Sequence, residues 1–163
     1  MVSIGTYPDA EIVAAAWVMS IPGIQIDLAD WRLPWDIQTP MNSGYVQLTV
    51  VGGVPLKDAP YFESIMQVDC WVEAPSEDRI FRMQASSIAK QIQYAALDRK
   101  NAKRGVTPQP YLWNGETITY AHAHVSSVVC MQEPHRMQST DNPMYEGYSM
   151  DMMFTWAANI VVN

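Results

Sequence analysis

The stretch from 61 to 97, YFESIMQVDCWVEAPSEDRIFRMQASSIAKQIQYAAL, joins a strand pattern to a helix pattern. Its first part alternates between apolar and polar residues, and Gln67 and Asp69 lie on the face expected to be wet. The opposite face carries the apolar residues Phe62, Met66, Val68, Cys70 and Val72. This alternation predicts an antiparallel strand over 61–72 that is buried on one side only.

The second part of the stretch has apolar residues at helical spacing. They form one stripe: Phe81, Ala85, Ile88, Ala89, Ile92 and Ala96. Glu77 and Asp78 suit a first turn after Ser76, because the helix dipole favours negative charge there. Gly105 is expected to close the helix. A half-buried strand followed by a long amphipathic helix favours an α+β domain.

The same two periodicities predict the remaining elements. A helix is expected to begin after Asp9 and to end near Ser20. Further strands are expected at 24–28, 45–51, 117–131 and 145–158. Gly52-Gly53 is expected to stop the second of these, and Ser126-Ser127 to form a bulge. The sequence therefore predicts one α+β domain over 1–163, with a mainly antiparallel four- to five-stranded sheet and two helices packed on one face.

Composition and charge narrow the class of protein. The chain has 17 acidic and 10 basic residues, a net charge of −7, so its overall field does not favour binding to the outside of DNA. Its charged fraction of 17% lies below the usual ~25%, which points to surface covered by other protein. Cys70 and Cys130 lie in apolar strand patterns and are expected to be buried free thiols. Neither a signal peptide nor a membrane span is expected, so a reducing cytoplasm is the predicted place of synthesis.

One pair of residues raises the question of metal chemistry. His122 and His124 would share a face of the predicted strand, about 7 Å apart, close enough to hold one ion. A zinc site needs a third ligand, but His135 lies in a loop and Cys130 lies beyond the expected bulge. No GxSxG, P-loop, GxGxxG or CxxC motif is present. The histidines are interpreted as surface or interface residues, no cofactor is expected, and a small metal-dependent enzyme is the alternative.

Two proline-bearing loops carry aromatic residues outside any periodic element. We take five of their residues as candidates for a protein interface: Trp31, Arg32, Trp35, Tyr111 and Trp113. Aromatic residues and arginine are enriched in such interfaces. Aromatic residues that cap the core beneath long loops are the other interpretation.

Four of the ten basic residues cluster behind the second helix: Arg99, Lys100, Lys103 and Arg104. Basic residues at a helix C-terminus complement the helix dipole. Alternatively, the cluster contacts an acidic partner surface or DNA that passes nearby. The absence of interleaved aromatic residues argues against sequence-specific reading of nucleic acid.

Taken together, the segments resemble the tail terminator family of long-tailed bacteriophages, also called tail completion or tail-to-head joining proteins. YPDAEIVAAAWVMSIPG at 7–23 is similar to the family's short N-terminal helix, and YVQLTVVGGVP at 45–55 to its strand ending in Gly-Gly. The strand and Ala-rich helix of 61–97 are the most typical part. YEGYSMDMMFTWAANI at 145–160 resembles the final strand.

The resemblance implies a structural virion protein rather than an enzyme. Family members form hexameric rings that sit on the last ring of the tail tube, stop its polymerisation and offer a docking face to the head. The implied partners are other copies of the chain, the tail tube protein, the head-completion or stopper protein, and double-stranded DNA passing through the lumen, with no membrane. The implied location is the head-tail interface of the virion, after assembly in the host cytoplasm. A head-completion, adaptor or minor tail protein of the same virion is the nearest alternative.

Overall fold

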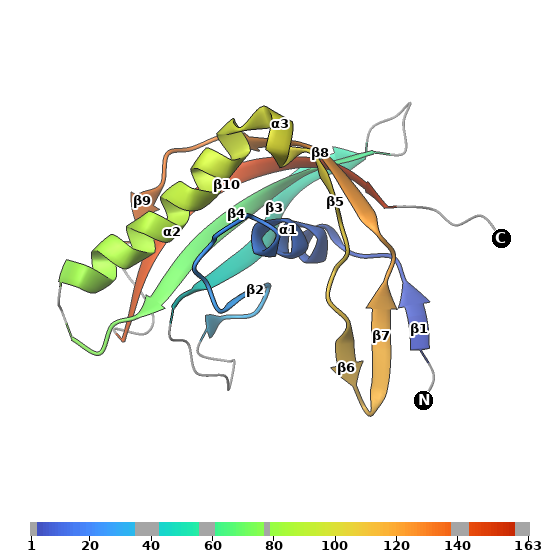
Figure 1. The fold of residues 1–163 in the computed structure, drawn as a ribbon, viewed down its shortest axis with the longest axis horizontal. Helices are drawn as coiled ribbons and strands as arrows, with labels where there is room; N and C mark the ends of the chain where they lie inside the picture. Colours follow the sequence, from blue (N-terminus) through green and yellow to red (C-terminus); the bar gives the residue numbers. More distant parts are fainter. Residues whose placement is uncertain (1–2, 35–42, 56–60, 77–78, 138–143, 159–163) are drawn as a thin grey trace.

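The computed structural model describes residues 3–34, 43–55, 61–76, 79–137 and 144–158, with side chains from Thr6 onward. Figure 1 shows how its helices and strands are arranged. In chain order they are β1 Ser3–Thr6, α1 Ala10–Met19, β2 Leu28–Asp30, β3 Tyr45–Pro55, β4 Phe62–Glu73, α2 Arg79–Leu97, α3 Arg99–Ala102, β5 Arg104–Val106, β6 Tyr111–Trp113, β7 Glu116–Tyr120, β8 Ala123–Cys130, β9 His135–Arg136 and β10 Tyr145–Ala158.

A large mixed sheet is built around the pairing of β4 with β10. Its strand order is β2-β3-β4-β10-β8-β5, and β9 also pairs with β10. The central pair is antiparallel along its whole length, from Tyr145 opposite Glu73 to Trp156 opposite Phe62. Among the described strands of this sheet, β2 and β3 are the parallel pair. The fold is therefore α+β, as predicted, but the sheet has seven strands among the described residues, more than the four or five expected.

The strongest sequence patterns are confirmed by the structure. β4, α2 and β10 lie where alternation and helical spacing place them. The α2 stripe is buried at Ala85, Ile88, Ala89, Ile92 and Ala96. Along β10 the residues that alternate into the core are Met150, Met152, Phe154 and Trp156. These elements carry their own periodicity, so the apolar face of each identifies the side that packs inward.

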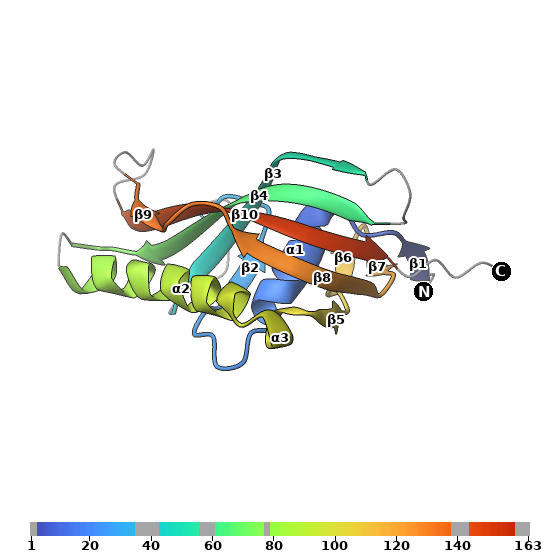
Figure 2. The same cartoon turned by 90° about the horizontal axis from the view of Figure 1, so that it is seen from above.

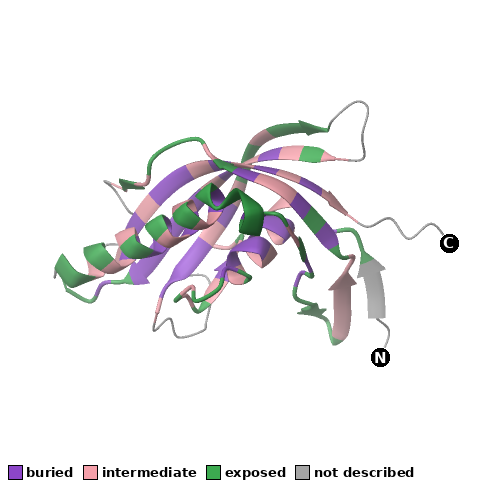
Figure 3. Cartoon of the chain, turned by 45° about the horizontal axis from the view of Figure 1, so that its top comes forward, coloured by how far each residue is buried: buried purple, intermediate pink, exposed green. Residues whose placement is uncertain are grey.

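Both long helices pack on the same face of the large sheet. Residues of α1 and α2 belong to one buried cluster with the inward side chains of β3, β4, β8 and β10. Figure 2 shows the sheet as one layer with the helices beneath it, and Figure 3 shows purple, buried segments along their contact. Trp17 of α1 is fully buried and meets Phe154 edge-on, with ring centroids 5.4 Å apart. No helix within the described ranges is long and apolar enough to cross a membrane.

The prediction of one strand over 117–131 is wrong, because Ala121 and His122 separate two strands, β7 and β8. The first half, β7, joins β1 and β6 in a separate three-stranded sheet, and the second half, β8, joins the large sheet. The predicted bulge is confirmed. Thr155 pairs with Ser127 and Trp156 with Val125, which leaves Ser126 without a partner in the register.

The Gly52-Gly53 pair does not end β3, contrary to prediction. The strand shifts register between Val50 and Gly52 and continues to Pro55, still paired with β4. Gly53, with φ of 128°, adopts a conformation that an L side chain rarely takes, so glycine lets the strand pass this irregularity. The prediction of a strand at 24–28 is also wrong in its position, since β2 begins to pair with β3 only at Leu28.

The ends of both helices differ from the sequence expectation. Asp9 occupies the N-cap position of α1 but makes no side-chain capping hydrogen bond. α2 ends at Leu97 rather than at Gly105, because Asp98 caps the short α3 and accepts a hydrogen bond from the Asn101 amide. Gly105 lies in β5, paired with His124.

The helix-free face of the sheet holds a second, smaller cluster. Tyr45 and Trp71 are buried there, with Leu28, Met137 and Tyr145 packed against them. Asp69 of the same face, expected to be wet, is only 5% exposed. It accepts hydrogen bonds from Ser149 Oγ at 2.5 Å and from Gln67 Nε2. These donors offset part of the cost of removing a carboxylate from water.

Candidate functional site

A groove of about 630 Å³ lies between α1, β2 and β6. Four of the five predicted interface residues line it: Trp31, Arg32, Tyr111 and Trp113. Trp35, the fifth, lies outside the described residues. The prediction of a loop is wrong for the second aromatic segment, because Tyr111–Trp113 form the strand β6, but the fold brings the two distant segments to one place. We call this feature, with a floor formed by Ile12, Ala15, Ala16 and Met19 of α1, the aromatic groove.

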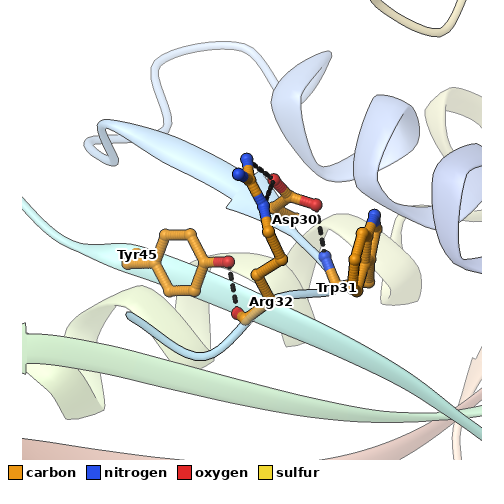
Figure 4. A network of polar contacts seen from close by, with 4 residues as sticks. All are labelled: Asp30, Trp31, Arg32 and Tyr45. Atoms are coloured by element: carbon orange, nitrogen blue, oxygen red, sulfur yellow. Dashed lines mark hydrogen bonds and ion pairs between the residues drawn. The ribbon is translucent and has the colours of Figure 1, made fainter. Parts of the chain in front are cut away.

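One wall of the aromatic groove is held by a polar network at the end of β2 (Figure 4). Asp30 Oδ2 accepts hydrogen bonds from Arg32 Nε and Nη2, and Asp30 Oδ1 accepts one from the Trp31 amide at 2.7 Å. Tyr45 donates its hydroxyl hydrogen to the Arg32 carbonyl. The hydrogen bond with Asp30 raises the pKa of Arg32, against the effect of burial. The network fixes the backbone while the Trp31 side chain stays 52% exposed.

The opposite wall is the β6–β7 hairpin. Its turn, Asn114-Gly115, has positive φ at both residues, 49° and 78°, which is typical of a two-residue hairpin turn. Tyr111, Leu112 and Trp113 of β6 are 45%, 67% and 54% exposed. Within the part of the chain that the structure describes, β6 pairs on one side only, with β7. The wall is therefore an apolar edge strand, a feature that proteins normally cover.

The hairpin is anchored by the N-terminal strand. β1 runs parallel to β7, and the Ala121 amide donates a hydrogen bond to the Thr6 carbonyl at 2.9 Å. Tyr120 of β7 lines the aromatic groove. Burial raises the pKa of Tyr120, and the nearby carboxylates of Asp9 and Asp30 raise it further. Arg32 offsets the charge of Asp30, whereas Asp9 and Glu116, the latter opposite Trp113 in the hairpin, place further negative charge beside the groove; we call these two residues the acidic rim.

The structure separates the four basic residues predicted as partner or lumen contacts. Arg99 and Lys100 lie on α3, Lys103 follows it, and all three are exposed. Arg104 turns inward instead, with its guanidinium over the Trp17 ring at 4.9 Å from the centroid. Burial lowers the pKa of Arg104. Its contacts are with the core, whereas the other three remain available at the surface.

The two histidines considered as metal ligands do not share a strand. His122 lies in the break between β7 and β8, where its Nδ1 is 2.9 Å from Thr107 Oγ1, and His124 lies on β8. The described residues contain no group of three His, Cys, Asp or Glu side chains placed to hold a metal ion. Gly105 allows His122 to sit closely, since a Cβ there would lie 2.4 Å from its Nε2. The close contact between Gly105 and the His122 ring, together with the contact to Thr107, accounts for both residues without a metal ion.

Sequence reasoning missed a polar hollow on the helix-free face. It is lined by Gln67, Gln132, His135, Arg136, Met137, Ser149 and Asp151, beside the buried Asp69. Register places Gln67 opposite Asp151 and Asp69 opposite Ser149 across the central strands. Alternation assigned these residues to a solvated face, and no local signal marks the β9 segment that lines the hollow beside them. Only the long-range pairing of β9 with β10 reveals the hollow.

Neither the models of known protein families nor the curated proteins contain a match to this chain.

Proposed function

We propose that this chain is a structural virion protein that forms a ring, hexameric by resemblance to the tail terminator family, at the head-proximal end of a phage tail tube. In this role it ends tube polymerisation and provides the docking surface for the head-completion protein. DNA passes through the lumen without sequence-specific binding. The chain acts by assembly and carries out no reaction.

The observation that carries this proposal is the aromatic groove. Trp31, Tyr111 and Trp113 each leave 45–54% of their surface open to solvent, although buried aromatic rings of this size stabilise interfaces strongly. They gather on two walls of one hollow rather than lying scattered, which marks an interaction site. A surface of this composition favours protein rather than a small polar substrate as the partner.

The arrangement of the small sheet supports assembly into a closed ring. The β1, β7 and β6 strands project from the body as an arm, as Figure 1 shows. An arm on one subunit that meets a different surface on the next makes head-to-tail contacts, and such contacts close into rings when the rotation allows. The free edge of β6 supplies main-chain donors and acceptors for a neighbour.

The net charge of −7 is consistent with DNA passing through rather than adhering. A ring of acidic subunits has a field that repels phosphate at distances up to about 10 Å at 0.1 M salt. Acidic faces turned toward the lumen would let duplex DNA slide past. The exposed basic residues of α3 would then contact neighbouring protein subunits rather than the DNA in the lumen.

Light scattering across a concentration series, with and without the tail tube protein, tests the proposal. We expect ring-sized particles, or a mass that rises toward them, and capture of the chain at one end of preformed tubes in electron micrographs. A chain that stays monomeric and leaves the tube ends bare would contradict it. Binding to the portal complex instead of the tube would assign the chain to the head side, as an adaptor.

A further inference from the structure

The solvent side of α2 carries a second apolar stripe that the core does not use. Its positions repeat at spacings of three and four: Ile80, Met83, Ser87, Lys90, Tyr94 and Leu97. The four large apolar side chains among them are 61–66% exposed. Such a stripe is typical of a helix that packs against a partner on both sides. We call these six residues the α2 outer face.

The α2 outer face is set in the most basic part of the chain. Residues 79–104 contain seven of the ten Lys and Arg residues and one of the 17 Asp and Glu residues, a balance of 7 − 1 = +6. The remaining residues therefore carry −7 − 6 = −13. Six of the seven bases are exposed, all except Arg104. An acidic protein thus presents one strongly basic helical side.

A hollow of about 600 Å³ interrupts the α2 outer face. The small residues Ser86 and Ser87 line it together with Met83, Tyr94, Arg82 and Lys90. Small residues between large ones leave a place for a side chain from a facing surface, as in knobs-into-holes packing. The shape therefore suits a protein partner with a protruding apolar or aromatic side chain.

The chemistry of the α2 outer face restricts its partner. Duplex DNA would meet the basic residues but would leave Ile80, Met83 and Leu97 without an apolar contact. The α2 outer face of a second copy would match the apolar stripe, but the two segments 79–104 would then oppose a balance of +6 with another of +6. A surface that is both aromatic and acidic satisfies both requirements.

The aromatic groove has this composition on the same chain. The segments that build it, 3–34 and 106–120, contain five acidic residues and one basic residue, a balance of −4. Asp30 of the lining is ion-paired with Arg32, so the negative charge beside the groove comes from the exposed Asp9, which acts electrostatically on Tyr120, and from Glu116, which lies opposite Trp113 in the hairpin register. Exposed Trp rings suit Met side chains and Arg or Lys cations. Figures 1 and 2 place α2 and the hairpin toward opposite ends of the molecule, so one copy can use both surfaces at once.

We propose that the α2 outer face of one copy docks on the aromatic groove of the next copy. The proposal rests on the ring function above and identifies the contact that repeats around it. Met83 and Leu97 cover the rings of Trp31 and Trp113, while Arg82 and Lys90 approach the acidic rim at Asp9. Because the two surfaces differ, each copy accepts one neighbour and is accepted by another.

Two full-length variants that each lose one surface test this contact. The face variant carries Met83→Glu and Lys90→Glu, and the groove variant carries Trp31→Lys and Trp113→Lys. All four residues are exposed, so both variants are expected to fold, as checked by circular dichroism and thermal unfolding. Met131→Glu, on a Met that is 54% exposed and outside both surfaces, is the matched control.

Light scattering of the wild type, each variant alone and their equimolar mixture gives the result. We expect the wild type and the Met131→Glu control to form multimers and each variant alone to be monomeric at 18.4 kDa. The mixture should form a dimer of twice that mass and nothing larger, because only one intact face and one intact groove remain per pair.

Three outcomes would overturn the inference. A face variant that assembles like the wild type would show that α2 is not in the contact. If that variant also bound duplex DNA at low salt less tightly than the wild type, the basic side would be assigned to nucleic acid. A mixture that stays monomeric would show that the two surfaces do not meet. A wild type that stays monomeric in solution would also overturn this contact, whereas capture at tail tube ends would leave the ring function standing.

Discussion

Trp17 Nε1 donates a hydrogen bond of 2.9 Å to the main-chain carbonyl of Ala102. The bond ties α1 to the end of α3, and both residues are buried. The guanidinium of Arg104 lies over the ring of the same tryptophan, 4.9 Å from the Trp17 ring centroid. One tryptophan thus joins the first helix, the short third helix and β5, and so holds the floor of the aromatic groove in place.

Trp17→Phe should destabilise the fold without removing the apolar core around the ring. The Ala102 carbonyl would lose its donor in a buried place, which costs about 1–3 kcal/mol of unfolding free energy. Urea denaturation followed by circular dichroism measures this loss. Trp31→Phe, on a ring that is 52% exposed, is the matched control and should change the unfolding free energy by less than about 0.5 kcal/mol. Equal losses in the two variants would contradict the role of the hydrogen bond.

The sequence predicts those parts of the fold whose periodicity is local. The buried stripe of α2 and the alternation of β4 and β10 each arise within one element, so reading the residues identifies both type and face. The bulge at Ser126 is likewise visible as a change of phase. The two strands β4 and β10 make up the centre of the large sheet, and α2 packs on it.

Features that depend on distant pairing could not be read in this way. The apolar phase changes at the break, from Ile118 and Tyr120 to Ala123 and Val125, but no local signal shows that β7 lies in another sheet beside β1. Asp69 looks solvated by alternation, but it is only 5% exposed and accepts a hydrogen bond from Ser149 of β10. The aromatic loops were recognised as candidates by composition, whereas their meeting in one groove required the fold.

Gly53→Ala should be strongly destabilising, because β3 passes close to β4 at this residue. An added Cβ would lie 2.1 Å from the Glu63 carbonyl oxygen and 2.8 Å from Ser64 Cα, both backbone atoms, and φ is 128°. Backbone strain of this kind costs about 1–3 kcal/mol before the clash is counted. Thermal unfolding of Gly53→Ala and of Gly52→Ala gives the comparison. A Cβ at Gly52 would make only ordinary contact with Ile65, so a similar loss there would argue against the clash.

Asp69→Asn should stabilise the protein at neutral pH. Burial raises the pKa of Asp69 above its ordinary value of 3.8, although hydrogen bonds from Ser149 and Gln67 act against this. A carboxyl with a raised pKa in the folded chain favours folding below pH 3.8, and this contribution is lost as the pH rises through the folded value. Asparagine keeps an acceptor for Ser149 Oγ but does not ionise.

Urea unfolding of the wild type and Asp69→Asn between pH 3 and pH 7 tests this titration. The stability advantage of the variant should be absent at the acid end and should grow as the pH rises. A variant that is less stable than the wild type at pH 7 would mean that the charged carboxylate, held by its two donors, stabilises the fold instead.

The two cysteines should react very differently with a thiol reagent. Cys70 is fully buried, and burial raises its pKa far above that of a free thiol. Cys130 is only partly buried and donates to the Gln132 carbonyl. In the native protein we expect one thiol to react, slowly because burial also raises the pKa of Cys130, and the second only in denaturant. Cys130→Ser should abolish the native reaction, and a remaining fast thiol would contradict the burial of Cys70.

Trp113→Ala should weaken self-association without weakening the fold. The residue lies at the tip of β6, 54% exposed, on a wall of the aromatic groove. Truncation of an aromatic side chain at the centre of an interface typically costs about 2 kcal/mol or more, which raises the dissociation constant roughly 30-fold. Analytical ultracentrifugation measures the constant, and thermal unfolding at low concentration measures the fold. Val51→Ala, also 54% exposed but outside the groove, should leave both unchanged. Equal effects of the two substitutions would show that the groove has no special part in assembly.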